Sequence, residues 1–155
     1  YVESSSNDDL NAEMRFLKEK VVTPGNTIIE CGTHHGWTTL LLGQWTGNTG
    51  KVIGFEINPK NAAVARKNFE LNHCENILLE CKGTGSEDGS VSIFRKSNAS
   101  VVPKNKLSLG YIKNSIYGQE TVELVSLDSY AERNKLKPDI LKLDVEGYEA
   151  EVQMI

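Results

Sequence analysis

A chain of 155 residues has the length of one domain and can bury one sizeable hydrophobic core. Its 39% hydrophobic and 25% charged residues are ordinary for a globular protein and argue against a disordered or fibrous chain. The formal net charge of −4, with Lys and Arg scattered, argues against nucleic acid as the main partner. No apolar run approaches the roughly 18 residues of a membrane helix, and the polar N-terminus does not resemble a signal peptide.

The three cysteines, Cys31, Cys74 and Cys81, are odd in number and lack the spacing of a metal site. We therefore expect reduced thiols in a cytoplasmic protein, with no membrane partner and no disulfide framework. The sequon Asn98-Ala99-Ser100 lacks a secretory context, and we interpret it as a chance match.

The first half of the chain alternates strand and helix patterns. Asn7 or Asp8 is predicted to cap a first helix that runs to about Lys20, with a turn at residues 23–26. The next expected elements are strands over 27–31, 52–56 and 76–80, a helix over 37–45, and a helix that begins at Pro59 behind an Asn58 cap. This order predicts a parallel sheet with right-handed crossovers.

The second half is less regular. The turn at Asp88-Gly89, followed by an expected strand over 91–94, predicts a hairpin that departs from the alternation. Residues 97–118 lack periodicity and are expected to form a loop over a site. Later we expect strands over 122–125 and 139–144, a helix over 127–136 and another from Tyr148. Because the chain ends inside that helix, we expect a domain truncated at its C-terminus.

The first predicted strand runs into a glycine loop, Glu30-Cys31-Gly32-Thr33-His34-His35-Gly36. Gly32 allows a tight turn and the approach of a ligand without a Cβ in the way. Gly36 allows close packing where the next helix begins, with free N–H groups for polar ligand atoms. Glu56, at the end of the second strand, is placed to accept two hydrogen bonds from a ribose, or else to cap the turn that follows.

The loop favours one nucleotide class over others. An NAD site would need a second glycine where this chain has His34, and the absence of Gly-Lys-Ser/Thr excludes a P-loop. S-adenosylmethionine has no phosphate but carries an amino group and a sulfonium, and the acid of Glu30 suits that cationic end. We therefore expect S-adenosylmethionine as the cofactor.

The glycine loop, Glu56 and the segment 139–149 together resemble the FkbM family of methyltransferases. The family's most specific motif, Lys-x-Asp-x-Glu-Gly-x-Glu, is matched by Lys142, Asp144, Glu146, Gly147 and Glu149. The resemblance runs from about residue 24 to the end. It implies an α/β, class I methyltransferase fold, which is a Rossmann-like three-layer sandwich with a mostly parallel sheet. It also implies S-adenosylmethionine as methyl donor and O-methylation of a sugar or natural-product hydroxyl.

With this resemblance, we divide the chain into an N-terminal helix and lead-in over 1–23 and a cofactor-binding core over 24–155. The residues 81–84 would lie near the adenine. The expected cofactor-binding residues are Glu30, Gly32, Thr33, His34, Gly36, Glu56, Cys81, Gly83 and Asp144. The candidate catalytic residues are Asp144, Glu146 and His35, of which a carboxylate or a histidine would accept the proton of the hydroxyl. No metal site is expected, because neighbouring histidines on a loop rarely face one ion.

Several of these residues also have a purely structural interpretation. Strand alternation places Lys142 and Asp144 on one face, where an internal ion pair could simply set the packing. Glu149 could only favour the dipole of the helix that follows. The two histidines could line the pocket without doing chemistry. Trp37 and Trp45 are expected in the core, and so are Cys31 and Cys81.

Two other functions stay open at this point. One is an NAD-binding oxidoreductase domain, and the other is a cofactor-binding module without catalysis. The expected acceptor of a methyl group is a small molecule or a saccharide.

Overall fold

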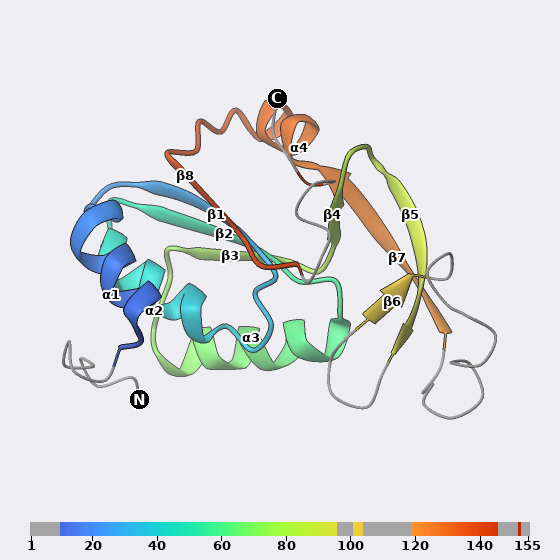
Figure 1. Cartoon of the computed structure of the whole chain (residues 1–155), viewed down its shortest axis with the longest axis horizontal. Coiled ribbons are helices and arrows are strands. Elements are labelled where there is room, and N and C mark those ends of the chain that lie inside the picture. The colour runs from blue at the N-terminus through green and yellow to red at the C-terminus, as the bar shows by residue number, and fades with distance from the viewer. Residues whose placement is uncertain (1–9, 96–100, 104–118, 146–151, 153–155) are drawn as a thin grey trace.

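The computed structural model describes residues 10–95, 101–103, 119–145 and 152, and Figure 1 shows their arrangement. The helices are α1 (Ala12–Phe16), which continues as the π-helix η2 (Leu17–Val21), then α2 (Trp37–Thr46), α3 (Pro59–Leu71) and α4 (Leu127–Asn134). The strands are β1 (Thr27–Cys31), β2 (Lys51–Phe55), β3 (Ile77–Glu80), β4 (Gly83–Gly85), β5 (Gly89–Arg95), β6 (Val101–Pro103), β7 (Gln119–Ser126) and β8 (Ile140–Leu143). None of the described helices has the length and apolar character needed to span a membrane.

The main sheet is parallel throughout its described part, with the strand order β3-β2-β1-β8. The prediction of parallel strands joined by helices is therefore confirmed for the first half of the chain. β1 lies between β2 and β8, and the register pairs Glu30 with Gly54 on one side and with Lys142 on the other. The carboxyl ends of these three strands consequently meet at one edge.

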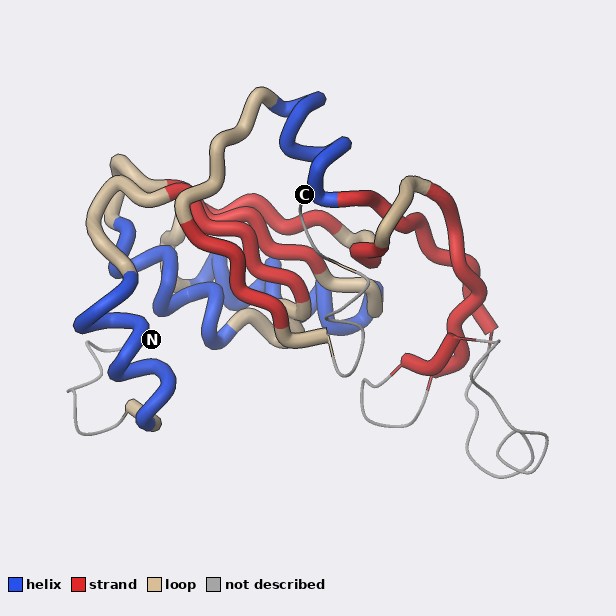
Figure 2. The backbone as a smooth tube through the Cα atoms, turned by 45° about the horizontal axis from the view of Figure 1, so that its top comes forward, coloured by secondary structure: helices blue, strands red, loops and turns tan. Residues whose placement is uncertain are grey.

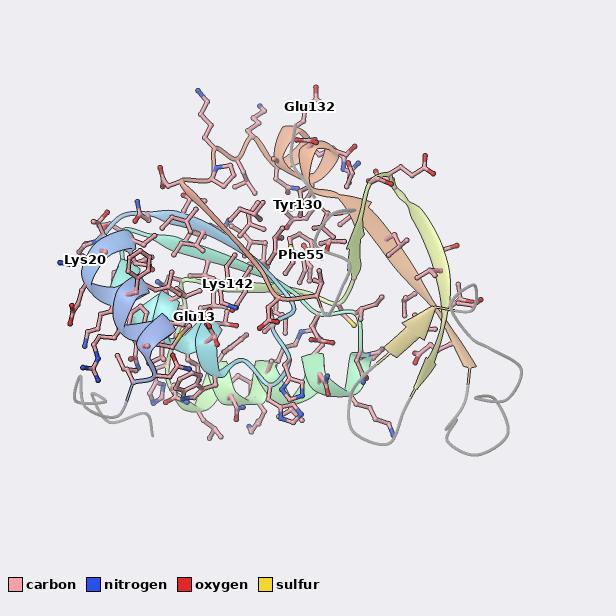
Figure 3. The ribbon with its side chains drawn as sticks, in the orientation of Figure 1. Glu13, Lys20, Phe55, Tyr130, Glu132 and Lys142 are labelled. Atoms are coloured by element: carbon pink, nitrogen blue, oxygen red, sulfur yellow. The ribbon has the colours of Figure 1, made fainter. Side chains whose placement is uncertain are left out.

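Helices cover both faces of this sheet, as Figure 2 shows. Alternation along β1 explains the layers, since neighbouring side chains point to opposite faces. Ile28 packs with Leu42 of α2, whereas Ile29 shares a cluster with Tyr130 of α4. The rings of Tyr130 and Phe55 pack edge to face, with their centroids 4.9 Å apart and their planes at 81° (Figure 3). The three-layer sandwich expected from the family resemblance is present.

A second sheet, with the order β4-β7-β5-β6, extends from the main sheet (Figure 1). β5 pairs antiparallel with both β6 and β7, so the expected departure from the alternation is confirmed. The predicted turn at Asp88 does not join paired strands, however, because β7 lies between β4 and β5. Asp88 instead accepts a hydrogen bond from the backbone N–H of Ser126 at the end of β7, 2.8 Å away.

Part of the segment expected to be a loop is strand β6, which pairs with the end of β5. The loop prediction over 97–118 is therefore wrong at residues 101–103, where two β-branched valines favour a strand. The other residues of that segment lie outside the described residues, as do Asn98 and the helix expected from Tyr148.

The first helix begins later than predicted. Its N-cap is Asn11, whose Oδ1 accepts the backbone N–H of Met14 at 2.9 Å, and the caps predicted at residues 7 and 8 lie outside the described residues. Leu10 and Met14 are buried in a cluster with Leu41 of α2. The helix closes with an N–H of Val22 that reaches back five residues to the carbonyl of Leu17 at 2.8 Å.

The core prediction is wrong for Trp37, which is 48% exposed. Trp37 is the first residue of α2, and the buried residues of that helix begin at Thr39 and continue with Leu40 and Leu41. Trp45 is half-buried against the cluster of Leu42. Cys31 is fully buried, as expected, whereas Cys81 is only half-buried beside α3.

The end of α2 is capped by Asn76, the residue just before β3. Its Nδ2 donates to the carbonyl oxygens of Gly43 at 2.8 Å and Gly47 at 3.0 Å, and lies 3.3 Å from the Thr46 hydroxyl. These carbonyls belong to the last turn of a helix, which has no internal donors for them. One side chain therefore joins α2 to the strand that follows α3.

We predict that Asn76→Ala lowers the free energy of unfolding by about 2 kcal/mol, because it leaves these partly buried carbonyls without a donor. Urea unfolding monitored by circular dichroism measures the change. Asn134→Ala is the matched control, since its side chain donates one bond, to the Tyr130 carbonyl, at the exposed end of α4. Equal losses in the two variants would contradict the prediction.

Candidate functional site

The predicted site residues gather where β1, β2 and β8 end. The glycine loop follows β1, Glu56 follows β2 and Asp144 follows β8. In open α/β sheets, ligands bind outside the carboxyl ends of the strands. The topology therefore brings these three parts of the sequence to the position where a cofactor would bind.

Gly32 turns the chain out of β1 with a φ of +91°. Its N–H and that of Thr33 both donate to the Phe55 carbonyl, at 2.9 and 3.0 Å, which ties the loop to the end of β2. A Cβ at Gly32 would overlap the carbonyl oxygen of Asp144. The tight turn predicted at Gly32 is confirmed, and the place of a Cβ is taken by the Asp144 carbonyl just after β8. The contact of Gly32 with a ligand stays a prediction.

Gly36 is the N-cap of α2 and has a φ of +86°. A Cβ there would lie 2.5 Å from Cε1 of Phe69 and 3.2 Å from the Cβ of Ala65, so the glycine lets α2 start against α3. The predicted close packing is confirmed. The N–H of Gly36 itself donates to the Thr33 carbonyl at 2.9 Å, and the binding of polar ligand atoms by the N–H groups at the start of α2 stays a prediction.

Glu56 is nearly buried, at 6% exposed, and it fixes the shape of the loop. Its Oε2 accepts the backbone N–H of His34 and its Oε1 that of Asn58, each at 2.7 Å. The capping role that the sequence left open is thus present. A carboxylate has about four lone-pair positions, so each oxygen keeps capacity for another donor. The ribose role of Glu56 stays a prediction.

The two histidines of the loop are exposed and lie against each other. Their rings stack at a centroid distance of 3.9 Å, and His34 has a φ of +53°, which is unusual outside glycine. The His35 carbonyl accepts a bond from Asn68 of α3 at 2.7 Å, so this part of the loop is also anchored. The part of the chain that the structure describes holds no cluster of three His, Cys, Asp or Glu side chains suited to a metal.

Glu30 lies inside the structure, with 1% of its surface exposed. Its Oε2 accepts the Thr39 hydroxyl of α2 at 2.5 Å, and the Lys142 ammonium is 3.7 Å from its Oε1. Burial raises the pKa of this carboxyl, and the contacts with Thr39 and Lys142 offset part of that effect. Glu30 is thus enclosed in this structure, and its contact with the cofactor stays a prediction.

The expected pairing of Lys142 with Asp144 is confirmed, with Nζ and Oδ2 3.6 Å apart. Lys142 is the less exposed member, at 12%, whereas the Asp144 side chain is 68% exposed at the sheet edge. The partner that sequence reasoning missed is Glu30. Only the register of β1 with β8, which sets Glu30 opposite Lys142, could have revealed it.

The remaining predicted residues are more scattered. Gly83 opens β4, where a Cβ would lie 2.7 Å from Cδ1 of Ile57 in the loop after β2. Cys81 precedes it, and burial raises the pKa of its thiol. Burial also raises the pKa of Cys31 to about 12, so that thiol is unreactive. Glu146, Gly147 and Glu149 lie outside the described residues.

Comparison with known families identifies the family to which this domain belongs. The sequence profile of the methyltransferase FkbM domain matches residues 30–152, from the end of β1 to beyond β8. The chain belongs to the FkbM methyltransferase family. The chain therefore carries the domain of a methyltransferase family, and that family implies S-adenosylmethionine as the methyl donor.

Individual relatives of this FkbM domain match over short segments. The tRNA (adenine(57)-N(1)/adenine(58)-N(1))-methyltransferase TrmI of Methanocaldococcus jannaschii is 47% identical over 48 residues, 31% of this chain and 17% of the relative. The arsenite methyltransferase of Halobacterium salinarum is 34% identical over 56 residues, 36% of this chain and 14% of the relative. The chain thus spans less than a fifth of the length of either curated relative.

Solved structures also resemble part of the FkbM domain. A protein-L-isoaspartate O-methyltransferase matches with a TM-score of 0.44 and 23% identity, over 46% of this chain and 23% of that chain. A protein described as a putative rRNA methylase from Clostridium thermocellum matches with a TM-score of 0.43 and 28% identity, over 46% and 40% of the two chains.

The buried Glu30 carboxyl makes the stability of the domain depend on pH. A carboxyl with a raised pKa in the folded state stabilises the fold most below its ordinary value of 4.5, and that contribution is lost as the pH rises through the folded value. We predict that Glu30→Gln removes this loss. Its free energy of unfolding relative to wild type should therefore rise from about pH 5 upward, by at most about 1.4 kcal/mol per pH unit.

Urea unfolding at a series of pH values measures this difference. Glu13→Gln, on the exposed side of α1, is the control and should follow the wild-type profile. A Glu30→Gln profile parallel to that of wild type would show that burial does not perturb this carboxyl.

Proposed function

We propose that this domain transfers a methyl group from S-adenosylmethionine to a hydroxyl oxygen of a small-molecule or saccharide acceptor. The observation that carries the proposal is the meeting of the anchored glycine loop, Glu56 and the exposed Asp144 at one edge of the parallel sheet. The cofactor-binding core is taken to begin near residue 24, with the first helix packed on it through Leu10, Met14 and Leu41.

The residues at this edge fit the chemistry of the cofactor. Glu56 retains lone pairs for the two ribose hydroxyls. Because S-adenosylmethionine has no phosphate, the loop does not need phosphate-binding groups. The amino group of the methionine end needs an anion. Glu30 was expected to supply it, but its carboxylate is enclosed, and the exposed carboxylate at the same edge is that of Asp144. We therefore assign the amino group to Asp144.

The chemistry asks little of the protein beyond alignment. The sulfonium supplies a methyl group with a good leaving group already attached. The hydroxyl oxygen of the acceptor forms the new bond to carbon as the bond from carbon to sulfur breaks, which leaves S-adenosylhomocysteine. Fixed alignment of two reactants can lower the barrier by about 7 to 11 kcal/mol. The proton of the hydroxyl passes to a base. With Asp144 assigned to the amino group, the exposed candidate of the predicted set among the described residues is His35.

Charge and thiol chemistry support the remaining assignments. The net charge of −4 favours a small or neutral acceptor over nucleic acid, although one relative is named as a tRNA methyltransferase. All three cysteines are free thiols, which fits the reducing cytoplasm. A methylation assay should therefore compare hydroxylated saccharides with RNA as acceptors, and transfer to RNA alone would overturn the proposed acceptor class.

The cofactor assignment is tested by calorimetry with S-adenosylhomocysteine and with NAD. We predict binding of S-adenosylhomocysteine but not of NAD, and at least about tenfold weaker binding by Glu56→Ala, because the variant loses the acceptor of the ribose hydroxyls and of the His34 N–H. Glu80→Gln is the control. Its carboxylate ends the neighbouring strand and accepts the Tyr130 hydroxyl at 2.8 Å, so its variant should keep wild-type affinity.

Two results would contradict the proposal. Tight NAD binding without S-adenosylhomocysteine binding would favour the oxidoreductase alternative. Binding of S-adenosylhomocysteine without methyl transfer to any hydroxylated acceptor would favour a module that binds the cofactor without catalysis.

A further inference from the structure

Three charged side chains form a line from the interior of the domain to the edge of the cofactor site. The Lys142 ammonium lies 3.7 Å from Oε1 of Glu30 and 3.6 Å from Oδ2 of Asp144. Exposure rises along the line, from 1% for Glu30 through 12% for Lys142 to 68% for Asp144. The cation is thus shared almost equally between a carboxylate in the core and one at the surface.

The inner end of this line is held through both its backbone and its side chain. Glu30 is on β1, which is paired on both sides, and its carboxylate is held by the Thr39 hydroxyl of α2. Its Oε1 has no hydrogen-bond partner among the described residues, so the Lys142 ammonium is what compensates its charge. A buried carboxylate is costly without a nearby cation, and this cost holds Lys142 in place.

The outer end is fixed in its backbone but not in its side chain. The Asp144 N–H donates to the Cys31 carbonyl at 2.9 Å, and its own carbonyl packs on Gly32. Beyond that, the carboxylate extends into solvent, and Lys142 is the cation beside it in the described structure. An exposed aspartate has several rotamers, and a neighbouring fixed cation favours the one that brings its oxygens closest.

We propose that Lys142 is a positioning residue for the cofactor site: anchored by Glu30, it orients the Asp144 carboxylate toward the amino group of the methionine end. The inference rests on the proposed function, because it needs Asp144 to contact the cofactor. It assigns a role to the lysine of the Lys-x-Asp motif. Because Lys142 and Asp144 are two residues apart in the strand direction, their side chains lie on one face of the sheet. Lys142 itself does not touch the ligand.

The alternative is that Lys142 forms an ion pair with a structural role only. The two roles predict different effects on stability and on cofactor affinity. A structural Lys142 would change the stability of the domain but not the contribution of Asp144 to binding. A positioning Lys142 acts only through Asp144, so its effect on affinity disappears when that carboxylate is absent. A double-mutant cycle separates the two cases.

The experiment measures the affinity of S-adenosylhomocysteine by calorimetry for the full chain, Lys142→Met, Asp144→Asn and the double variant. We expect Lys142→Met to bind about two- to tenfold more weakly, and the double variant to bind no more weakly than Asp144→Asn alone. Lys67→Met is the matched control, since it removes one member of an exposed ion pair on α3 and should leave affinity unchanged.

Unchanged affinity in Lys142→Met, or losses that add in the double variant, would overturn the inference while leaving the proposed function intact. Lack of binding by the wild-type chain would overturn the proposed function, and the inference with it. If Lys142→Met does not fold because Glu30 loses its cation, Glu30→Gln takes its place in the cycle. This variant removes the anchor of Lys142 and leaves no buried charge to compensate, so binding should weaken, and the loss should disappear when Asp144 is replaced by Asn; unchanged affinity in Glu30→Gln would overturn the inference.

Discussion

The site depends on the contact between the end of β1 and the end of β8. The Asp144 carbonyl occupies the space that a side chain at Gly32 would need, and the Asp144 N–H bonds to the Cys31 carbonyl. On the opposite side, two N–H groups of the loop converge on the Phe55 carbonyl of β2. The chain leaving β1 is therefore held from both neighbouring strands, and the loop takes its direction from them. A glycine is required at this position by backbone packing before any ligand is considered.

The same pairing of β1 with β8 explains the charges. Because the strands are in parallel register, a carboxylate at the penultimate position of β1 faces a lysine at the corresponding position of β8. Their side chains point to the face covered by α2, where a lone charge would be unstable. Two residues later the strand reaches the sheet edge on the same face, and Asp144 is exposed there. Lys142, which compensates the charge of Glu30 in the core, and the exposed carboxylate of Asp144 are thus only two residues apart in the chain.

Sequence reasoning succeeded where the determining interactions are local. The Asn58-Pro59 start of α3, the glycine turns and the apolar runs of β1 and β2 each depend on neighbours in the chain, and the structure has them as predicted. It failed where distant segments decide. The insertion of β7 between β4 and β5 depends on pairs such as Phe94 with Gln119 and Gly83 with Leu124, which are far apart in the chain. The Glu30–Lys142 pair likewise joins residues from opposite halves of the chain. Neither follows from periodicity, which describes one segment at a time.

Glu56 has a structural role whose geometry is compatible with the ribose-binding role proposed for it. Each of its oxygens accepts one backbone N–H, from the loop after β1 and from the start of α3. An amide in its place would turn a donor toward one of these N–H groups, so the position needs a carboxylate even before a ligand binds. The lone pairs that remain point away from those two donors. A ribose bound there would meet acceptors already oriented by the protein, and little ordering of the loop would oppose its binding.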